Sequence, residues 1–197
     1  LLSPSATRFD LPTWTIEAWI RPDVLTDATI ISRQVQIGVT NYALTLNPGG
    51  LVSVMFTADD HGTNVVLTAP AAKAIPAGGW AHVAGTFDAA LGRLSLYING
   101  ELVAAMTTQE RPAVNGVSPV YTLVGKGFDG LMDEVGVFNT ALPLSSIIDT
   151  MYGIATVDLT PVAYYRFDDG TSATNNGAGV WPGVSAESTW TRGQVQE

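Results

Sequence analysis

The chain has 197 residues, of which 46% are hydrophobic, and 18 acidic against 9 basic side chains give a net charge of −9 at pH 7. This acidic balance disfavours nucleic acid and anionic lipid as partners, because both select basic surfaces. The absence of cysteine excludes disulfides, thiolate catalysis and cysteine-bound zinc. No apolar run approaches the ~20 residues of a membrane-spanning helix, so we expect no insertion into a membrane.

The first half of the chain alternates strand-forming runs with turn signals. Residues 14–22, WTIEAWIRP, alternate apolar and polar side chains with the period of two of a half-buried strand. Residues 28–34 and 41–50 follow, and a Pro-Gly-Gly turn signal closes the second run. A polar loop at 59–64 then separates two further β-branched runs.

The clearest unit is a hairpin at residues 80–106. Asn99 and Gly100 lie between two apolar runs, and this dipeptide favours a type I′ turn because both central residues need positive φ. A two-residue turn there predicts that Leu96 lies opposite Val103 on a face of the core.

The last third predicts two strands within residues 120–142, one helix and one more strand. The helix is expected over residues 143–152, because Pro143 suits a first helical position and Gly153 suits a left-handed cap. Residues 162–170 form the final strand segment. Many short strands with one late helix predict an all-β sandwich or jelly roll rather than an alternating β/α fold.

Five segments, in this order, resemble bacterial laminin-G-like domains of the concanavalin A-like lectin/glucanase superfamily, whose relatives include pentraxins. They are TWTIEAWIRP, GGWAHVAGTFD, LSLYINGELVA, FDGLMDEVGVFNTAL and PLSSIID, within residues 9–152. Any one of them is weak evidence, so the specificity lies in their order. The resemblance implies a two-sheet antiparallel jelly roll, the class that the strand pattern also predicts.

The resemblance divides the chain into two parts. Residues 1–160 are expected to form the laminin-G-like jelly roll. In the family, a segment like residues 162–170 commonly opens a domain, whereas here it follows the helix. Residues 161–197 have too few apolar positions for a core of their own. We therefore expect them to supply a strand and a loop tail that dock on the same sandwich or on a neighbouring copy.

Asp133 and Glu134 lie inside the predicted strand at residues 130–138. Strand alternation gives them opposite faces, with Asp133 on the face of Val135. The family usually has a basic residue at the position of Gly136, which indicates that the face of Glu134 is the more solvent-exposed one. Asp133 is therefore expected to point inward, where an unpaired charge is very costly. Its partner would be backbone N–H groups, an arginine or a bound cation.

The resemblance also implies a structural calcium ion, because relatives often hold one between an early-strand acid and an acid of this strand. Calcium takes carboxylates and loop carbonyls, and the segment FDDG offers both. The candidate ligands are Asp133, Asp168, Asp169 and Gly170. The alternative is that Asp133 caps backbone amides and the later acids are solvated.

The carboxylate spacing argues against glycoside hydrolysis. A retaining pair needs both carboxylates on one face, whereas Asp133 and Glu134 are neighbours in the chain. Glu17 and Glu134 could meet only across strands. The two histidines have no metal-ligand spacing, and there is no Gly-x-Ser-x-Gly elbow. We therefore expect a protein that is not an enzyme, with a glycoside hydrolase as the less favoured alternative.

Candidate ligand contacts are aromatic rings predicted to face away from the core, which could stack on sugars, and polar side chains of one loop. They are Trp19, Tyr42, Tyr97, Asp59, Asp60 and Asn64. The alternatives are that loops or a neighbouring domain cover the rings, and that the polar loop is only solvated.

These features predict a non-catalytic extracellular or cell-surface module, for binding or adhesion, that recognises carbohydrate or a protein partner. The alternative class is a structural subunit of a surface layer or filament, which self-associates through its C-terminal strand by strand exchange. Because the first residue is Leu1 rather than methionine, we expect the chain to be a processed or excised piece of a longer protein.

Overall fold

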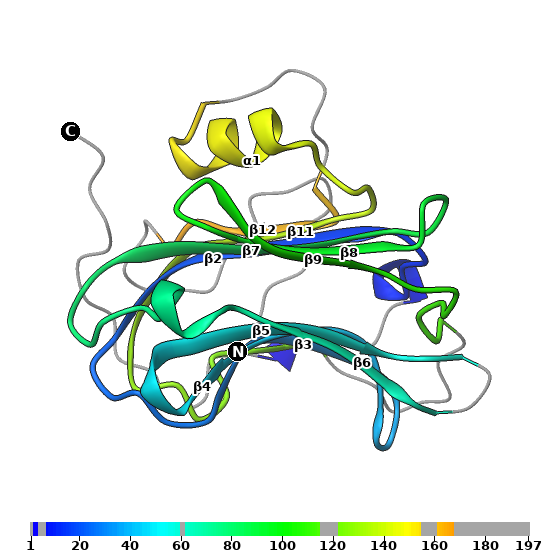
Figure 1. The fold of residues 1–197 in the computed structure, drawn as a ribbon, viewed down its shortest axis with the longest axis horizontal. Helices are drawn as coiled ribbons and strands as arrows, with labels where there is room; N and C mark the ends of the chain where they lie inside the picture. Colours follow the sequence, from blue (N-terminus) through cyan, green and yellow to red (C-terminus); the bar gives the residue numbers. More distant parts are fainter. Residues whose placement is uncertain (1, 4–6, 60–61, 115–121, 155–160, 168–197) are drawn as a thin grey trace.

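The computed structural model describes residues 2–3, 7–59, 62–114, 122–154 and 161–167, which form two antiparallel sheets stacked face to face (Figure 1). Each sheet has six strands, and helix α1 (Leu144–Met151) lies on the outer face of one of them. This architecture confirms the predicted sandwich with one short helix. None of the helices in these ranges is long and apolar enough to cross a membrane.

Sheet A has the strand order β1-β10-β3-β4-β5-β6, and sheet B the order β12-β11-β2-β7-β8-β9. In these orders, the strands of sheet A span Leu2–Ser3, Thr122–Val124, Ala28–Gln36, Val39–Asn47, Leu51–Thr57 and Asn64–Thr68. Those of sheet B span Ala163–Tyr165, Gly130–Phe138, Trp14–Pro22, Ala81–Asp88, Arg93–Ile98 and Glu101–Thr107. Within the described ranges, the short 3₁₀ turns are η1 (Thr7–Phe9), η2 (Pro48–Gly50) and η3 (Ala71–Lys73).

Both sheets turn alternate side chains toward a shared core. In β2, Trp14, Ile16 and Ile20 are fully buried between the sheets, as the period of two predicts. The Trp14 ring lies 5.9 Å from the ring of Tyr42 and 6.0 Å from that of Phe87, measured between centroids. Tilted aromatic pairs of this kind add to the free energy of apolar burial, so these rings join sheet A to sheet B.

The β8–β9 hairpin confirms the predicted turn and corrects its register. Asn99 and Gly100 have φ values of 49° and 72°, as a type I′ turn requires. A bulge after Leu96 then shifts the pairing by one residue, so Leu96 lies opposite Ala104 and not opposite Val103. Turn chemistry predicts the first pair beyond the turn, but it does not reveal an extra residue further along the strand.

Strand β12 lies within the C-terminal part of the chain and pairs antiparallel with β11 of the same chain. Tyr165 is opposite Val135, and Ala163 is opposite Val137. The division at residue 160 stays a prediction, because residues 155–160 and 168–197 lie outside the described ranges.

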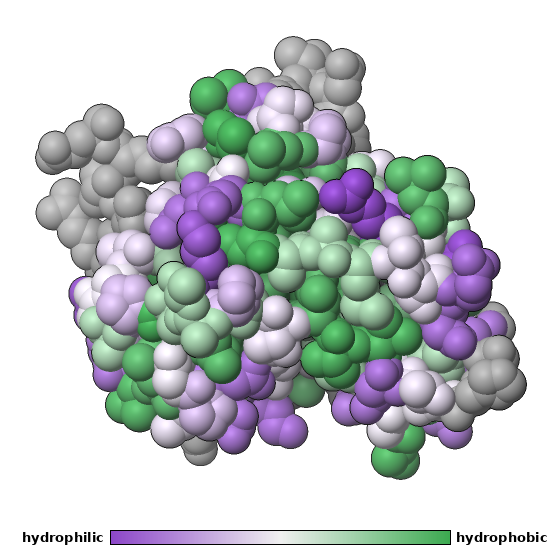
Figure 2. All heavy atoms as spheres, in the orientation of Figure 1, coloured by the Kyte–Doolittle hydropathy of each residue, from purple (hydrophilic) through white to green (hydrophobic). Residues whose placement is uncertain are grey.

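The edge strands β6 and β9 close the core on one side of the sandwich (Figure 1). Apolar side chains gather over this side in the view of Figure 2. In these two strands, Leu67, Val103 and Met106 are only partly buried against the core. The sandwich edge is therefore only partly covered.

Gly85 in β7 lets the two sheets approach each other. A Cβ atom at this position would lie 2.5 Å from Cγ2 of Val54 in β5, which belongs to the opposite sheet. Atoms of a packed core cannot come that close, so any larger residue would force the sheets or the Val54 side chain to move.

We predict that Gly85→Ala lowers the free energy of unfolding by about 1–3 kcal/mol, because the added methyl overpacks the contact between the sheets. Urea unfolding monitored by tryptophan fluorescence measures the change. Val54→Ala serves as the matched background, since it vacates the space that the methyl needs. An equal cost of Gly85→Ala in both backgrounds would contradict the steric explanation.

Candidate functional site

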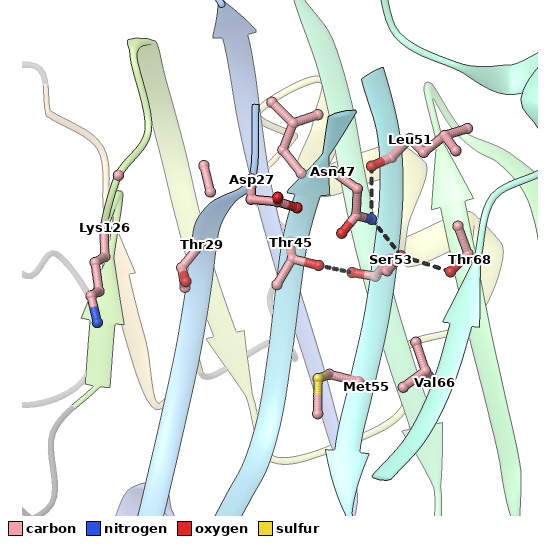
Figure 3. Close-up of a pocket in the computed structure, with 13 residues that line it drawn as sticks. Asp27, Thr29, Thr45, Asn47, Leu51, Ser53, Met55, Val66, Thr68 and Lys126 are labelled. Carbon is pink, nitrogen blue, oxygen red and sulfur yellow. Dashed lines mark hydrogen bonds between the residues drawn. The ribbon is translucent and has the colours of Figure 1, made fainter. Parts of the chain in front are cut away.

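The outer face of sheet A carries a groove with a volume of about 640 Å³. Its lining comes from β3, β4, β5 and β6 and from the turn that follows β10 (Figure 3). Helix α1 covers the outer face of sheet B, whereas no helix within the described ranges lies over this groove (Figure 1). The groove is therefore the open sheet face of this part of the molecule.

A row of hydroxyl side chains crosses the groove. Thr29 is opposite Thr45, Thr45 is opposite Ser53, and Ser53 is opposite Thr68, so four adjacent strands each contribute one hydroxyl. Residues directly opposite in a ladder share a face, and strands lie about 4.8 Å apart, so the row spans about 14 Å. Figure 3 shows the four side chains aligned across the strands. We call this set the hydroxyl row.

Neutral hydrogen bonds fix the centre of the hydroxyl row. The Asn47 amide Nδ2 donates to the carbonyl oxygen of Leu51 at 3.1 Å and to Oγ of Ser53 at 2.7 Å. Oγ of Ser53 lies 2.8 Å from Oγ1 of Thr68, and Oγ1 of Thr45 lies 3.5 Å from the Ser53 carbonyl oxygen. Ser53 is buried and Thr68 is exposed, so this network of hydrogen bonds leads from a buried hydroxyl to one that solvent in the groove can reach.

Two other kinds of side chain border the hydroxyl row. Met55 and Val66 lie opposite each other and form an apolar flank, with Val66 49% exposed. Asp27 and Lys126 supply one negative and one positive charge at the β3–β10 end. Within the described residues, none of those lining the groove is aromatic.

Trp19 and Tyr97 lie on the outer face of sheet B, away from the main core, but α1 covers that face. Nε1 of Trp19 donates to the carbonyl oxygen of Met151, the last residue of α1, at 3.0 Å. Tyr97 is buried in a second apolar cluster with Phe138 and Ile147. Both rings therefore pack against the helix. They are covered, as the alternative to sugar stacking predicted, but the cover is the chain's own helix rather than a loop or a neighbouring domain.

The prediction that Tyr42 faces away from the core is wrong. Its side chain is fully buried between the sheets beside Trp14. Strand alternation explains the placement, since Leu44 and Leu46 point into the same core and Tyr42 shares their parity in β4.

The described residues of the polar loop, 59 and 62–64, do not line the groove. Asn64 uses its Oδ1 to accept a hydrogen bond from Oγ1 of Thr57 at 2.8 Å, which ties β6 to β5. Asp59 has an exposed side chain, and its backbone N–H donates to the carbonyl oxygen of Arg111 at 2.9 Å. Asp60 lies outside the described ranges.

A β-bulge reverses the predicted face of Asp133. Asp133 is opposite Trp19 and Gly136 is opposite Glu17, so β11 has two residues where β2 has only one. Glu134, with a φ of 49°, is in the left-handed conformation of such a bulge. Asp133 therefore lies on the outer, helix-covered side of sheet B together with Trp19, and the prediction that it points between the sheets is wrong.

Asp133 is nevertheless buried, with only 4% of its surface exposed. Its Oδ1 accepts a hydrogen bond from the backbone N–H of Glu134 at 2.9 Å, one of the partners that the sequence left open. Asp168, Asp169 and Gly170 lie outside the described ranges. The described residues hold no group of three or more His, Asp or Glu side chains that could bind a metal. The calcium site stays a prediction.

A carboxyl group that sequence reasoning weighed only as a catalytic candidate lies buried beneath α1. Glu17 is 1% exposed, and its Oε2 accepts a hydrogen bond from Oγ1 of Thr150 in α1 at 3.0 Å. Nε2 of His82 lies 3.8 Å from the same oxygen, and the His82 ring meets Trp19 edge-on. Glu17 and His82 are thus in contact, and burial disfavours the charged form of each of them.

Burial sets the protonation of this pair. Loss of water raises the pKa of Glu17 to about 8, with a further contribution from the negative charge of Glu134. Burial lowers the pKa of His82 to about 3. Although the 3.8 Å distance would suit an ion pair, we regard both groups as mainly neutral at pH 7, because each is almost completely removed from water.

The family model described as concanavalin A-like lectin/glucanases superfamily (Laminin_G_3) matches residues 2–148. No curated protein matches the chain. Among solved structures, the chain is similar to a candidate carbohydrate-binding protein from Bacteroides ovatus, with 22% identity and a TM-score of 0.64 over 87% of this chain. The match covers 51% of that protein, so the chain spans about half its length.

Two further similar structures contain sugars. One is the CBM40 module of the Ruminococcus gnavus IT-sialidase bound to α2,3-sialyllactose, with 20% identity and a TM-score of 0.59, covering 70% of this chain and 81% of that one. The other is domain 4 of AbnA, an extracellular arabinanase from Geobacillus stearothermophilus, in complex with arabinotriose. It has 23% identity and a TM-score of 0.52, covering 71% and 66% of the two chains. At these identities the likeness is one of fold.

The opposed pKa shifts predict a stability plateau between pH 4.5 and 6.5. Above pH 4.5 an unfolded chain releases the Glu17 proton that the folded state keeps up to about pH 8, so stability falls with rising pH over that range. Below pH 6.5 an unfolded chain protonates His82, which the folded state resists down to about pH 3, so stability falls with falling pH. The two slopes cancel where the ranges overlap.

Glu17→Gln tests this assignment, since glutamine has the shape of the neutral acid and cannot ionise. We expect its urea-unfolding free energy to lose the alkaline fall of the parent protein between pH 6.5 and 8 and to keep the acid limb. Parallel profiles for the two proteins over this range would show that Glu17 does not keep its proton.

Proposed function

The chain belongs to the concanavalin A-like lectin/glucanase superfamily, and on that premise we propose that it is a non-catalytic module that binds carbohydrate through the groove of sheet A. The observation that carries this proposal is the hydroxyl row, a set of uncharged groups held in register on an open sheet face. Ligand sites combine apolar surface with a few fixed polar groups, and the groove offers both. The sugar complexes of similar folds support this choice of ligand.

The position of the carboxylates supports a binding role over hydrolysis. Glycosidases of both common mechanisms need two carboxyl groups that flank the scissile bond. Among the described residues that line the groove, Asp27 is the sole acid. Glu17 is shielded beneath α1, on the other sheet. We propose an extracellular or cell-surface location for the module, where a glycan ligand would be met.

The alternative function, assembly by strand exchange, draws no support from the described contacts. β12, the described part of the predicted exchange strand, is paired with β11 of its own chain. Light scattering of the purified chain tests this alternative: a monomer agrees with the binding module, whereas concentration-dependent oligomers favour assembly.

We predict that the purified chain binds a subset of glycans on an array and releases no reducing ends from them. Thr68→Val, which keeps the shape of the side chain and removes its hydroxyl, should raise the Kd about 2- to 10-fold, the range expected for one neutral hydrogen bond. Thr107→Val is the matched control, because Thr107 is an exposed strand residue of β9 on the other sheet. Absence of binding to every glycan would refute the proposal.

We also propose a structural calcium ion that involves Asp133. A buried carboxylate is a ligand that calcium takes, and binding to the folded state alone would add stability. Calcium at about 100 times its Kd should raise the unfolding free energy by about 2.7 kcal/mol, measured against a sample with chelator. Asp133→Asn should abolish this difference. An unchanged melting temperature of the parent protein on chelation would remove the ion from the proposal.

A further inference from the structure

We infer that the groove takes a neutral, extended glycan that lies across the strands of sheet A and is held by the hydroxyl row rather than by aromatic stacking. This inference rests on the proposed function and adds the class of glycan and its direction. It follows from the register of four strands, the polarity of one hydrogen-bond chain and the charges that line the groove.

The direction follows from the hydroxyl row. Thr29, Thr45, Ser53 and Thr68 lie on a line perpendicular to the strands because each is directly opposite the next. A row of about 14 Å is longer than a single sugar ring. A ligand that contacts the whole row must therefore be an oligomer, with its long axis across β3 to β6 (Figure 3).

The hydrogen bonds around Ser53 orient the row. The two bonds from Nδ2 of Asn47 use both amide hydrogens, and one of them ends on Oγ of Ser53. The hydrogen of Ser53 is then best used toward Oγ1 of Thr68, 2.8 Å away, which leaves the Thr68 hydrogen to be donated into the groove. The described contacts of Asn47 leave its Oδ1 as an acceptor. A ligand hydroxyl is both donor and acceptor, so it can satisfy both atoms.

The apolar flank matches the other side of a sugar. Met55 and Val66 are two residues along their strands from Ser53 and Thr68, respectively, a separation of about 7 Å. A pyranose or furanose ring presents C–H groups on one face and hydroxyls at its edge. A chain of rings can thus place C–H groups over Met55 and Val66 and hydroxyls on the hydroxyl row.

The charges favour a neutral chain. The hydroxyl row and Asn47 carry no charge, and Asp27 and Lys126 are opposite charges at one end of the groove. The whole chain has a net charge of −9, which repels an anionic ligand. With no ring among the described lining residues, stacking is not the source of affinity.

The test is a calorimetric titration with neutral linear series, the arabino-, xylo- and cello-oligosaccharides, from monosaccharide to pentasaccharide. Affinity for at least one series should rise with chain length by 10-fold or more and then level off once the row is covered. Thr45→Val and Thr68→Val should each weaken the longest ligand about 2- to 10-fold and leave the thermal midpoint near that of the parent. Thr107→Val should change neither.

Two controls separate this inference from the proposed function. Sialyllactose supplies the anionic arm: tighter binding than the neutral series, lost in Lys126→Gln, would overturn the neutral assignment. A monosaccharide that binds as tightly as its pentasaccharide, or binding that both groove variants leave unchanged, would overturn the cross-strand placement while the module still binds carbohydrate. Absence of binding to every sugar would instead refute the proposed function itself.

Discussion

The docking of α1 on sheet B decides which face of the sandwich is open. Each sheet has one face in the shared core and one outer face, and the two outer faces differ. On sheet B, Trp19 donates to the end of α1, and the cluster of Tyr97, Phe138 and Ile147 removes that face from solvent. The outer face of sheet A keeps polar side chains and the groove. By covering the outer face of sheet B, α1 leaves that of sheet A as the open face, although no residue of the helix lines the groove.

That docking has an unusual polar component. Glu17 lies under α1 with the Thr150 hydroxyl and His82 as neighbours, so the helix rests on a carboxyl group whose charge would be costly there. The apolar cluster beside it stabilises the docking of the helix on the sheet, while the hydrogen bond between Thr150 and Glu17 fixes the position of the last turn of the helix. A neutral acid can serve in this place, since its Oε2 accepts the hydrogen bond from Thr150 without carrying a charge. The described residues that line the groove on the opposite sheet include neither Glu17 nor His82.

Sequence periodicity predicts the sandwich well and the faces of individual residues less well. The apolar residues of β2 lie in the core because nothing interrupts their alternation. Tyr42 also obeys alternation, because it has the same parity as the buried Leu44 and Leu46, and this parity was not applied when the ring was predicted to face away from the core. Asp133 and the register beyond Leu96 fail for a different reason, since a bulge inserts one residue and reverses every later face. Glu134, which takes a left-handed conformation without being glycine, gives no local signal of that bulge.

The groove could not be found from the sequence because it belongs to no single segment. Thr29, Thr45, Ser53 and Thr68 are separated along the chain by turns of different length, and only the pairing of β3 with β4, β4 with β5 and β5 with β6 aligns them. A slip of one residue in any of these pairs would turn a hydroxyl into the core and break the row. The buried Leu44, Leu46, Val52 and Val54 prevent such a slip, because it would expose them. The apolar core thus fixes the register, and the register creates the polar site on the other face.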